Sequence, residues 1–191
     1  MIVNALQFLL QSIVGMFAII VLLRFYLQLV SAPFQNPASQ FVVALSNFIV
    51  KPTRRIIPSW RGFDLSTLLL ALIAEWIVEF GLRWLADFPF LVAGTGVWVA
   101  LIGLAITDIV KLSIYIFLYA TVIQAVLSWV NPYSPVAPVL DALTRPLLKP
   151  LRQFIPLIGG FDLSPIVVVI GAQLIIMLFV MPLELYFSRM F

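Results

Sequence analysis

A stretch of basic and acidic residues occurs twice in this chain and holds most of the side chains that could bind a charged ligand. The first copy is Lys51–Ser66 (KPTRRIIPSWRGFDLS) and the second is Lys149–Ser164 (KPLRQFIPLIGGFDLS), with ten identities at a constant offset of 98. The charged positions of the two copies are Lys51, Arg54, Arg55 and Asp64 in the first and Lys149, Arg152 and Asp162 in the second. Basic clusters beside apolar segments are typical of contacts with a partner or with anionic lipid headgroups. The repetition predicts a chain of two related halves.

Polar residues inside apolar runs form a second candidate set. Arg24 and Glu75 lie at comparable depth in two apolar segments, and the offsets between the halves place Gln124 and Gln173 at the corresponding positions. Polar groups in hydrocarbon are costly unless they have a partner. We predict that Arg24 pairs with Glu75, and Gln124 with Gln173, so that each pair clamps the two spanning helices of its half. A lining for an ion or proton path is the alternative role.

Two further charged pairs have helical spacing. Glu79 and Arg83 are four apart in the favourable order, which predicts a local ion pair. Asp108 and Lys111 are three apart and can meet on one helix face. For Asp64 and Asp162 we favour a structural role ahead of helix N-termini over a paired cation site, because carboxylates are stabilised by the exposed amides there.

The residue types needed for most catalytic chemistry are missing. The chain has no Cys and no His, which removes thiol nucleophiles, thiolate metal sites and the commonest general base. Its serines have no histidine to activate them, and it shows no phosphate-binding glycine loop, metal cluster or basic–aromatic pattern for nucleic acid. We therefore expect a protein that is not an enzyme, with no catalytic residues, cofactor or bound metal and no nucleic-acid partner.

The composition indicates the medium in which these side chains lie. Hydrophobic residues make up 63% of the chain and charged residues 10%, with a mean hydropathy of +1.16, which predicts an all-α integral membrane protein. The N-terminal apolar run has no basic region before it and continues to full spanning length, so it is expected to be a membrane helix and not a cleaved signal peptide.

Four spans are predicted, two in each half. Ser66 and Ser164 are expected as N-caps, the latter followed by a proline at the first helical position. The expected spans are Leu6–Val30, Thr67–Leu85, roughly Asp108–Val130, and Pro165–Tyr186. The predicted units are a first repeat at 1–87, a hydrophobic connector at 88–107 that is re-entrant or interfacial, and a second repeat at 108–191.

Between the two spans of each half, a short apolar pattern precedes the basic stretch. Its residues are Phe41, Val42, Leu45, Phe48 and Ile49 in the first half, and Val136, Val139, Leu140, Leu143 and Leu147 in the second. Each segment is too short to span, so we predict amphipathic helices in the membrane interface, with basic ends facing anionic headgroups. The alternative is a helix packed on other protein.

The distribution of basic residues predicts the topology. Seven of the eleven lie in the two loop regions: Lys51, Arg54, Arg55, Arg61, Arg145, Lys149 and Arg152. Because basic loops remain in the cytoplasm, both are expected there, which requires an even number of crossings between them. We favour four spans in a bacterial inner membrane with both termini outside the cytoplasm. Five spans in an inverted repeat are the alternative.

The repeated pattern resembles the YggT family of small bacterial membrane proteins, which is similar to the YlmG proteins of cyanobacteria and chloroplasts. The resemblance rests on two copies of helix, Pro-rich loop, amphipathic segment, KPxRxxIP and GFDLS, and it covers nearly the whole chain. Bacterial relatives are associated with osmotic or ionic stress tolerance, and chloroplast relatives with cytochrome b6 maturation and nucleoid or division-linked organisation. The internal repetition falls in the interfacial loops, where partners and lipid are met, and this favours a non-enzymatic scaffold or assembly factor that acts as a homo-oligomer or with a membrane-protein partner. A small ion transporter or channel component in osmotic homeostasis is the alternative.

Overall fold

The computed structural model describes residues 1–60, 62–155 and 162–191. The motif positions Arg61, Pro156, Gly160 and Phe161 lie outside the described residues. Within the described residues the chain is helical between short connections: α1 (Ile2–Leu29), α2 (Pro37–Ile56), α3 (Leu65–Leu85), α4 (Gly96–Val130), α5 (Ala137–Phe154), α6 (Ser164–Ile175), a π-helical turn η1 (Ile176–Val180) and α7 (Met181–Ser188).

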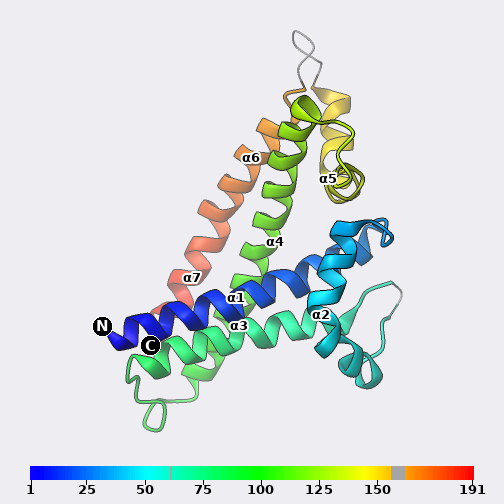
Figure 1. Cartoon of the computed structure of the whole chain (residues 1–191). Coiled ribbons are helices and arrows are strands. Elements are labelled where there is room, and N and C mark those ends of the chain that lie inside the picture. The colour runs from blue at the N-terminus through cyan, green and yellow to red at the C-terminus, as the bar shows by residue number, and fades with distance from the viewer. Residues whose placement is uncertain (61, 156–161) are drawn as a thin grey trace.

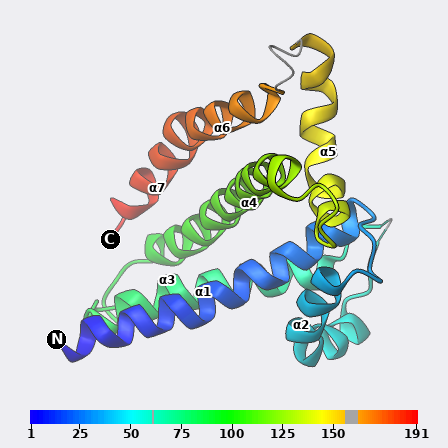
Figure 2. The same ribbon diagram turned by 45° about the horizontal axis from the view of Figure 1, so that its top comes forward.

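The long helices converge at one end and separate toward the other. α1 packs along α3, α3 packs against α4, and α6 and α7 pack against α4. Both chain termini lie at the end where the helices converge, whereas α2 and α5 lie at the opposite end (Figures 1 and 2). The two repeated basic stretches are therefore at the same end of the described structure.

The prediction of four spans is confirmed at the level of helix length and composition. The helices long and apolar enough to cross a membrane are Ile2–Leu29, Leu65–Leu85, Gly96–Val130 and the continuous stretch Ser164–Ser188. The four together define an α-helical membrane protein, since soluble domains do not contain apolar helices of this length and number.

The third span begins earlier than predicted. α4 starts at Gly96 and not near Asp108, so most of the expected connector belongs to a continuous helix of 35 residues. No proline interrupts it, and the Thr107 hydroxyl donates to the Gly103 carbonyl at 2.7 Å, one helical turn away. At about 1.5 Å per residue the helix exceeds the roughly 30 Å of hydrocarbon, so it must tilt or extend beyond the bilayer. The boundaries of the two repeats stay a prediction.

The last span contains a π-helical turn, η1, between α6 and α7. Pro182 follows directly at the start of α7. Proline has no N–H to donate and its ring clashes with the carbonyl of the preceding turn, and a widened turn relieves this conflict. Glu184 is thereby presented to α4, where its carboxylate accepts a hydrogen bond from Lys111 at 2.6 Å.

The apolar faces of the two amphipathic helices differ. On α2, Phe41, Leu45 and Phe48 are exposed while Val42 and Val50 are buried. The corresponding stripe of α5 is largely packed on protein: its buried members lie in one cluster with residues of α1, α2 and α4, namely Val139, Leu140 and Leu143 with Leu27, Val42 and Ala120. The expectation of a membrane-facing stripe is therefore wrong for most of α5, because this helix covers the gap between the two halves.

Candidate functional site

The first copy of the repeated motif forms an ion pair whose acidic member is buried. Arg54, in the last turn of α2, donates from Nε to the Asp64 carboxylate at 3.1 Å, and its Nη2 donates to the same carboxylate and to Gln28 Oε1, the latter at 2.7 Å. The Asp64 side chain has no exposed surface. Ser66 donates its hydroxyl to the other Asp64 oxygen at 2.5 Å. The motif therefore ties α2 to α1 and to the start of α3.

The second copy repeats the pair in a more exposed setting. Arg152 Nε donates to the Asp162 carboxylate at 2.7 Å, with the arginine side chain 48% exposed. The other Asp162 oxygen accepts from the backbone N–H of Ser164 at 2.9 Å. The structural role favoured for the two aspartates agrees with this arrangement.

The predicted serine caps are wrong. α3 begins at Leu65 and α6 begins at Ser164, so both serines lie within the helices. Ser66 donates to Asp64 instead of accepting from the helix amides, and the Ser164 hydroxyl, although buried, has no hydrogen-bond partner within the described residues. At the start of each helix, the aspartate two positions before the serine accepts the hydrogen bonds instead. Its carboxylate can accept several bonds, whereas a hydroxyl accepts fewer.

Both aspartates lie outside the spanning helices and have lowered pKa values. Burial alone acts to raise the pKa of the Asp64 carboxyl, but hydrogen bonds from Arg54 and Ser66, together with the arginine charge, lower it below its ordinary value. The pKa of Asp162 is lowered in the same way, against burial, by bonds from Ser164 and Arg152. Both carboxylates are therefore ionised at neutral pH and act as fixed partners of their arginines.

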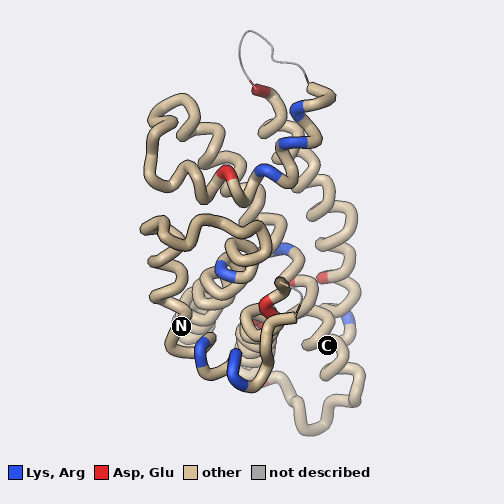
Figure 3. Tube along the Cα trace, turned by 90° about the vertical axis from the view of Figure 1, so that its right-hand side faces the viewer, with Lys and Arg blue, Asp and Glu red and all other residues tan. Residues whose placement is uncertain are grey.

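Three basic residues of the repeated motif are available to bind a ligand. Lys51, Arg55 and Lys149 are exposed, and none of them forms an ion pair with another described residue. Basic residues follow one another along α5 (Figure 3). The repeated stretch thus contains structural cations, Arg54 and Arg152, and cations that can meet a ligand.

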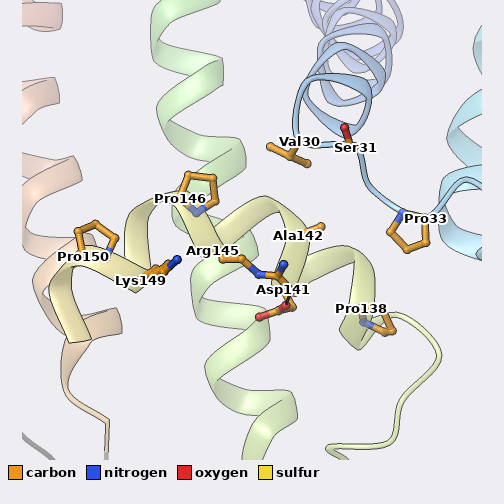
Figure 4. A pocket seen from close by; sticks show the side chains of 10 residues that line it. All are labelled: Val30, Ser31, Pro33, Pro138, Asp141, Ala142, Arg145, Pro146, Lys149 and Pro150. Carbon is orange, nitrogen blue, oxygen red and sulfur yellow. Dashed lines mark hydrogen bonds and ion pairs between the residues drawn. The ribbon is translucent and has the colours of Figure 1, made fainter. Parts of the chain in front are cut away.

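A groove beside these cations lies between the end of α1 and α5. It has a volume of about 550 Å³, and Arg145 and Lys149 line it from α5 while Val30 and Ser31 line it from the segment directly after α1 (Figure 4). Arg145 is paired with Asp141 one turn away. Lys149 has no such partner among the described residues, so it carries the groove's unbalanced positive charge.

The predicted pair of Arg24 with Glu75 does not form. Arg24 is buried on α1, and its Nη1 donates to Ser46 Oγ at 2.8 Å and to Asn47 Oδ1 at 3.0 Å, both on α2. The second half shows the same design, because Gln124 on α4 bonds to Thr144 and Asp141 on α5. The predicted clamp between spans is wrong, since each amphipathic helix offers closer polar groups than the second span does.

Glu75 and Gln173 therefore take no part in the polar contacts that join the first span of each half to its amphipathic helix. No bond joins Gln173 to Gln124 within the described residues, and Gln173 is exposed on α6. The sequence does contain a pattern that points to the observed partners of Arg24 and Gln124. Ser46 and Thr144 are both hydroxyl residues, and they are separated by the same offset of 98. The depths of Arg24 and Glu75 along straight helices do not indicate that α2 and α5 pack against the spans.

Four charged residues of the spanning helices α3 and α4 line one pocket. It lies between α1, α3 and α4, has a volume of about 400 Å³, and is lined by Glu75, Glu79, Asp108 and Lys111 among others. The predicted pair of Glu79 with Arg83 is confirmed. Lys111, however, pairs with Glu184 of α7 and not with Asp108, a partner that sequence reasoning missed because it lies 73 positions away.

No acidic triad suited to a metal ion occurs in residues 1–60, 62–155 and 162–191.

Comparison with known proteins identifies the family of this α-helical membrane protein. The sequence profile of the CCB3/YggT family matches residues 3–85 and 103–183. An uncharacterized protein of Pseudomonas aeruginosa is 38% identical over 178 residues, which cover 92% of this chain and 88% of that protein. Uncharacterized protein YggT of Escherichia coli (strain K12) is 35% identical over 170 residues, 87% of this chain and 85% of that protein. The chain belongs to the CCB3/YggT family. No solved structure matches it.

Proposed function

We propose that this protein is a non-enzymatic membrane scaffold or assembly factor whose α2 and α5 form a basic contact surface on the cytoplasmic side of a bacterial inner membrane. The observation that carries the proposal is that both repeated basic stretches lie at the same end of the helices, away from both termini (Figures 1 and 2). Basic segments beside spanning helices are retained in the cytoplasm and attract anionic lipid.

The side chains of α2 support a position in the membrane interface. Phe41, Leu45 and Phe48 are exposed on one side of this helix, and Lys51 and Arg55 follow along it. An exposed apolar stripe next to lysine and arginine is the arrangement of helices that lie among lipid headgroups. The α5 groove adds a place for a phosphate group beside Lys149.

The internal repeat is part of the same proposal. The family profile matches two stretches of the chain, 3–85 and 103–183, and the contacts Arg24–Ser46 and Gln124–Thr144 are equivalent. Two copies of one helix-and-loop unit, at 1–87 and 108–191, would present two basic surfaces to the same leaflet. From the resemblance stated for the sequence, we further propose that such a scaffold serves osmotic or ionic stress tolerance or the biogenesis of membrane complexes.

A complementation experiment tests the proposal. In a strain lacking the protein that grows poorly under osmotic stress, the triple replacement Lys51→Gln, Arg55→Gln and Lys149→Gln should fail to restore growth while the protein remains inserted at its normal level. Arg189→Gln removes an exposed cation at the other end of the molecule and should restore growth fully. Normal growth with the triple variant would contradict the proposal.

A small ion transporter or channel component is the second candidate, and the pocket at Glu75 and Asp108 is the observation in its favour. Purified protein in liposomes distinguishes the two. The scaffold proposal predicts no ion flux above that of empty vesicles, and selective flux would replace it with the transport function.

A further inference from the structure

The membrane pocket between α1, α3 and α4 contains two acidic side chains without an ion partner. Glu75 is the middle residue of α3 and only 6% exposed, and Asp108 reaches the same pocket from α4. Neither carboxyl group has a hydrogen bond or salt bridge with any other residue in the described parts of the chain, although both line a volume of about 400 Å³.

The neighbouring charges are already engaged. Glu79 is paired with Arg83, and Lys111 with Glu184, its Nζ lying 2.6 Å from the carboxylate. Two positive and two negative charges therefore cancel, and the carboxyls of Glu75 and Asp108 remain unbalanced. Isolated carboxylates at membrane depth are strongly unfavourable, which makes such residues candidates for binding a counter-ion.

The remaining polar groups of the pocket supply oxygen atoms. Gln11 and Ser12 of α1 and the Tyr115 hydroxyl of α4 line it, and carboxylate, amide and hydroxyl oxygens suit hard cations. The described residues offer no group of three acidic side chains for a metal ion, which argues against a site for a divalent ion. We propose that Glu75 and Asp108 bind a monovalent alkali cation in this pocket.

This inference does not depend on the proposed role of the basic surface. The basic residues lie at the ends of α2 and on α5, whereas the pocket lies along the middle of α3. A binding measurement at equilibrium tests the cation site, and complementation by the Lys51, Arg55 and Lys149 variant tests the contact surface, so either proposal can fail alone.

The test uses the purified full chain in lipid nanodiscs. Thermal unfolding is followed while sodium or potassium chloride replaces N-methylglucamine chloride at constant ionic strength. A ligand that binds only the folded protein raises the unfolding temperature with a saturable concentration dependence. We expect such a rise with at least one alkali cation and none with N-methylglucamine.

Matched substitutions assign the response to the pocket. Glu75→Gln and Asp108→Asn each remove a charged ligand while nearly keeping its shape, and each should weaken the apparent affinity about tenfold or more. Asp87→Asn removes the same charge from an exposed residue beyond α3 and should leave the affinity unchanged.

A second kind of variant keeps both carboxyls. Gly15 lines the pocket, and a Cβ added there would meet no atom within 4 Å, so Gly15→Leu is chosen to place a larger side chain in this space. It should fold normally and lose the alkali response. Identical unfolding of the wild type in all three salts would overturn the site. So would a response to pH without a response to alkali ions, or an alkali response that persists in Glu75→Gln and Asp108→Asn.

Discussion

Ser46 on α2 and Thr144 on α5 are 98 positions apart, and each hydroxyl is bonded to the polar side chain of the preceding spanning helix. Arg24 donates to Ser46 at 2.8 Å, and Gln124 contacts Thr144. In each half, one buried polar contact therefore fixes the amphipathic helix to the first span. The charged version in the first half and the neutral version in the second perform the same structural task.

This arrangement predicts which residues are energetically coupled. In a double-mutant cycle, Arg24→Leu with Ser46→Ala should show a coupling of about 1 kcal/mol, the usual size for a polar contact between membrane helices. Arg24→Leu with Glu75→Leu should show almost none, because the two side chains do not touch. Unfolding in mixed micelles measures both cycles, and strong coupling of Arg24 to Glu75 would contradict the structure.

The second half suggests a replacement that the first half should tolerate. Arg24→Gln combined with Ser46→Thr copies the Gln124–Thr144 contact, so the double variant should unfold within about 1 kcal/mol of the wild type. Arg24→Leu alone strands Asn47 and Ser46 and should be less stable than this double variant. Measured unfolding free energies test this order, and an equal or higher stability of Arg24→Leu would contradict it.

The two copies of the Arg–Asp pair should differ in strength. Asp64→Asn removes a fully buried partner of Arg54 and should cost about 2 kcal/mol of unfolding free energy. Asp162→Asn breaks a pair that is half exposed to solvent and should cost less than about 1 kcal/mol. Equal losses of unfolding free energy in the two variants would contradict the expectation that the burial of Asp64 strengthens its pair.

The Asp64 pair also predicts a dependence on pH. The pKa of this carboxyl is lower in the folded chain than its ordinary value of 3.8. A lowered folded pKa gives stability that is complete above the unfolded value and is lost as pH falls through the folded one. Unfolding free energy should therefore decline below about pH 4, and the decline should be smaller in Asp64→Asn. An identical pH profile for the two proteins would be the contrary result.

Close packing of α4 against α7 gives a prediction about two glycines. A Cβ at Gly103 would lie 2.4 Å from the Phe187 ring, whereas one at Gly81 would meet only the end of the flexible Leu10 side chain. Gly103→Ala should therefore cost about 1–3 kcal/mol through overpacking, and Gly81→Ala much less. Thermal unfolding of the two alanine variants measures the difference, which should disappear if α4 and α7 separate in the bilayer.

Cysteine labelling tests the proposed orientation. The chain has no native cysteine, so Ser59→Cys and Gln153→Cys, both at exposed positions, can be probed without background. A membrane-impermeant thiol reagent should reach both from the cytoplasmic side only. Labelling of the two positions from opposite sides would restore the inverted repeat with five spans.

The sequence was sufficient for the features that depend on local pattern. Long apolar runs predicted four spans, and the spacing of Glu79 and Arg83 predicted their ion pair, because both depend on residues close together in the chain. The start of α4 was missed because the two basic loops required an even number of crossings, so the residues before Asp108 were assigned to a connector, whereas a glycine without a proline is compatible with a continuous helix packed against Phe187.

The partners of the buried polar residues could not be obtained in the same way. Arg24 was assigned to Glu75 from depth alone, and depth does not specify which face of a helix a neighbour covers. The contact of α5 with α1 and α4 also removes most of its apolar stripe from lipid. These outcomes depend on the crossing of helices from different halves, which the spacing within one helix does not encode.

The proposed contact surface consists of exposed cations on α2 and α5 that bind anionic lipid, and lipid retention by the purified protein tests this binding. The full chain is released from nanodiscs containing equal amounts of phosphatidylglycerol and phosphatidylcholine, and the lipids that remain bound are counted by native mass spectrometry. The account predicts that the wild type and Arg189→Gln retain phosphatidylglycerol preferentially, and that the variant with Lys51→Gln, Arg55→Gln and Lys149→Gln loses this preference. Equal retention of the two lipids by the wild type, or an unchanged preference in the triple variant, would contradict it.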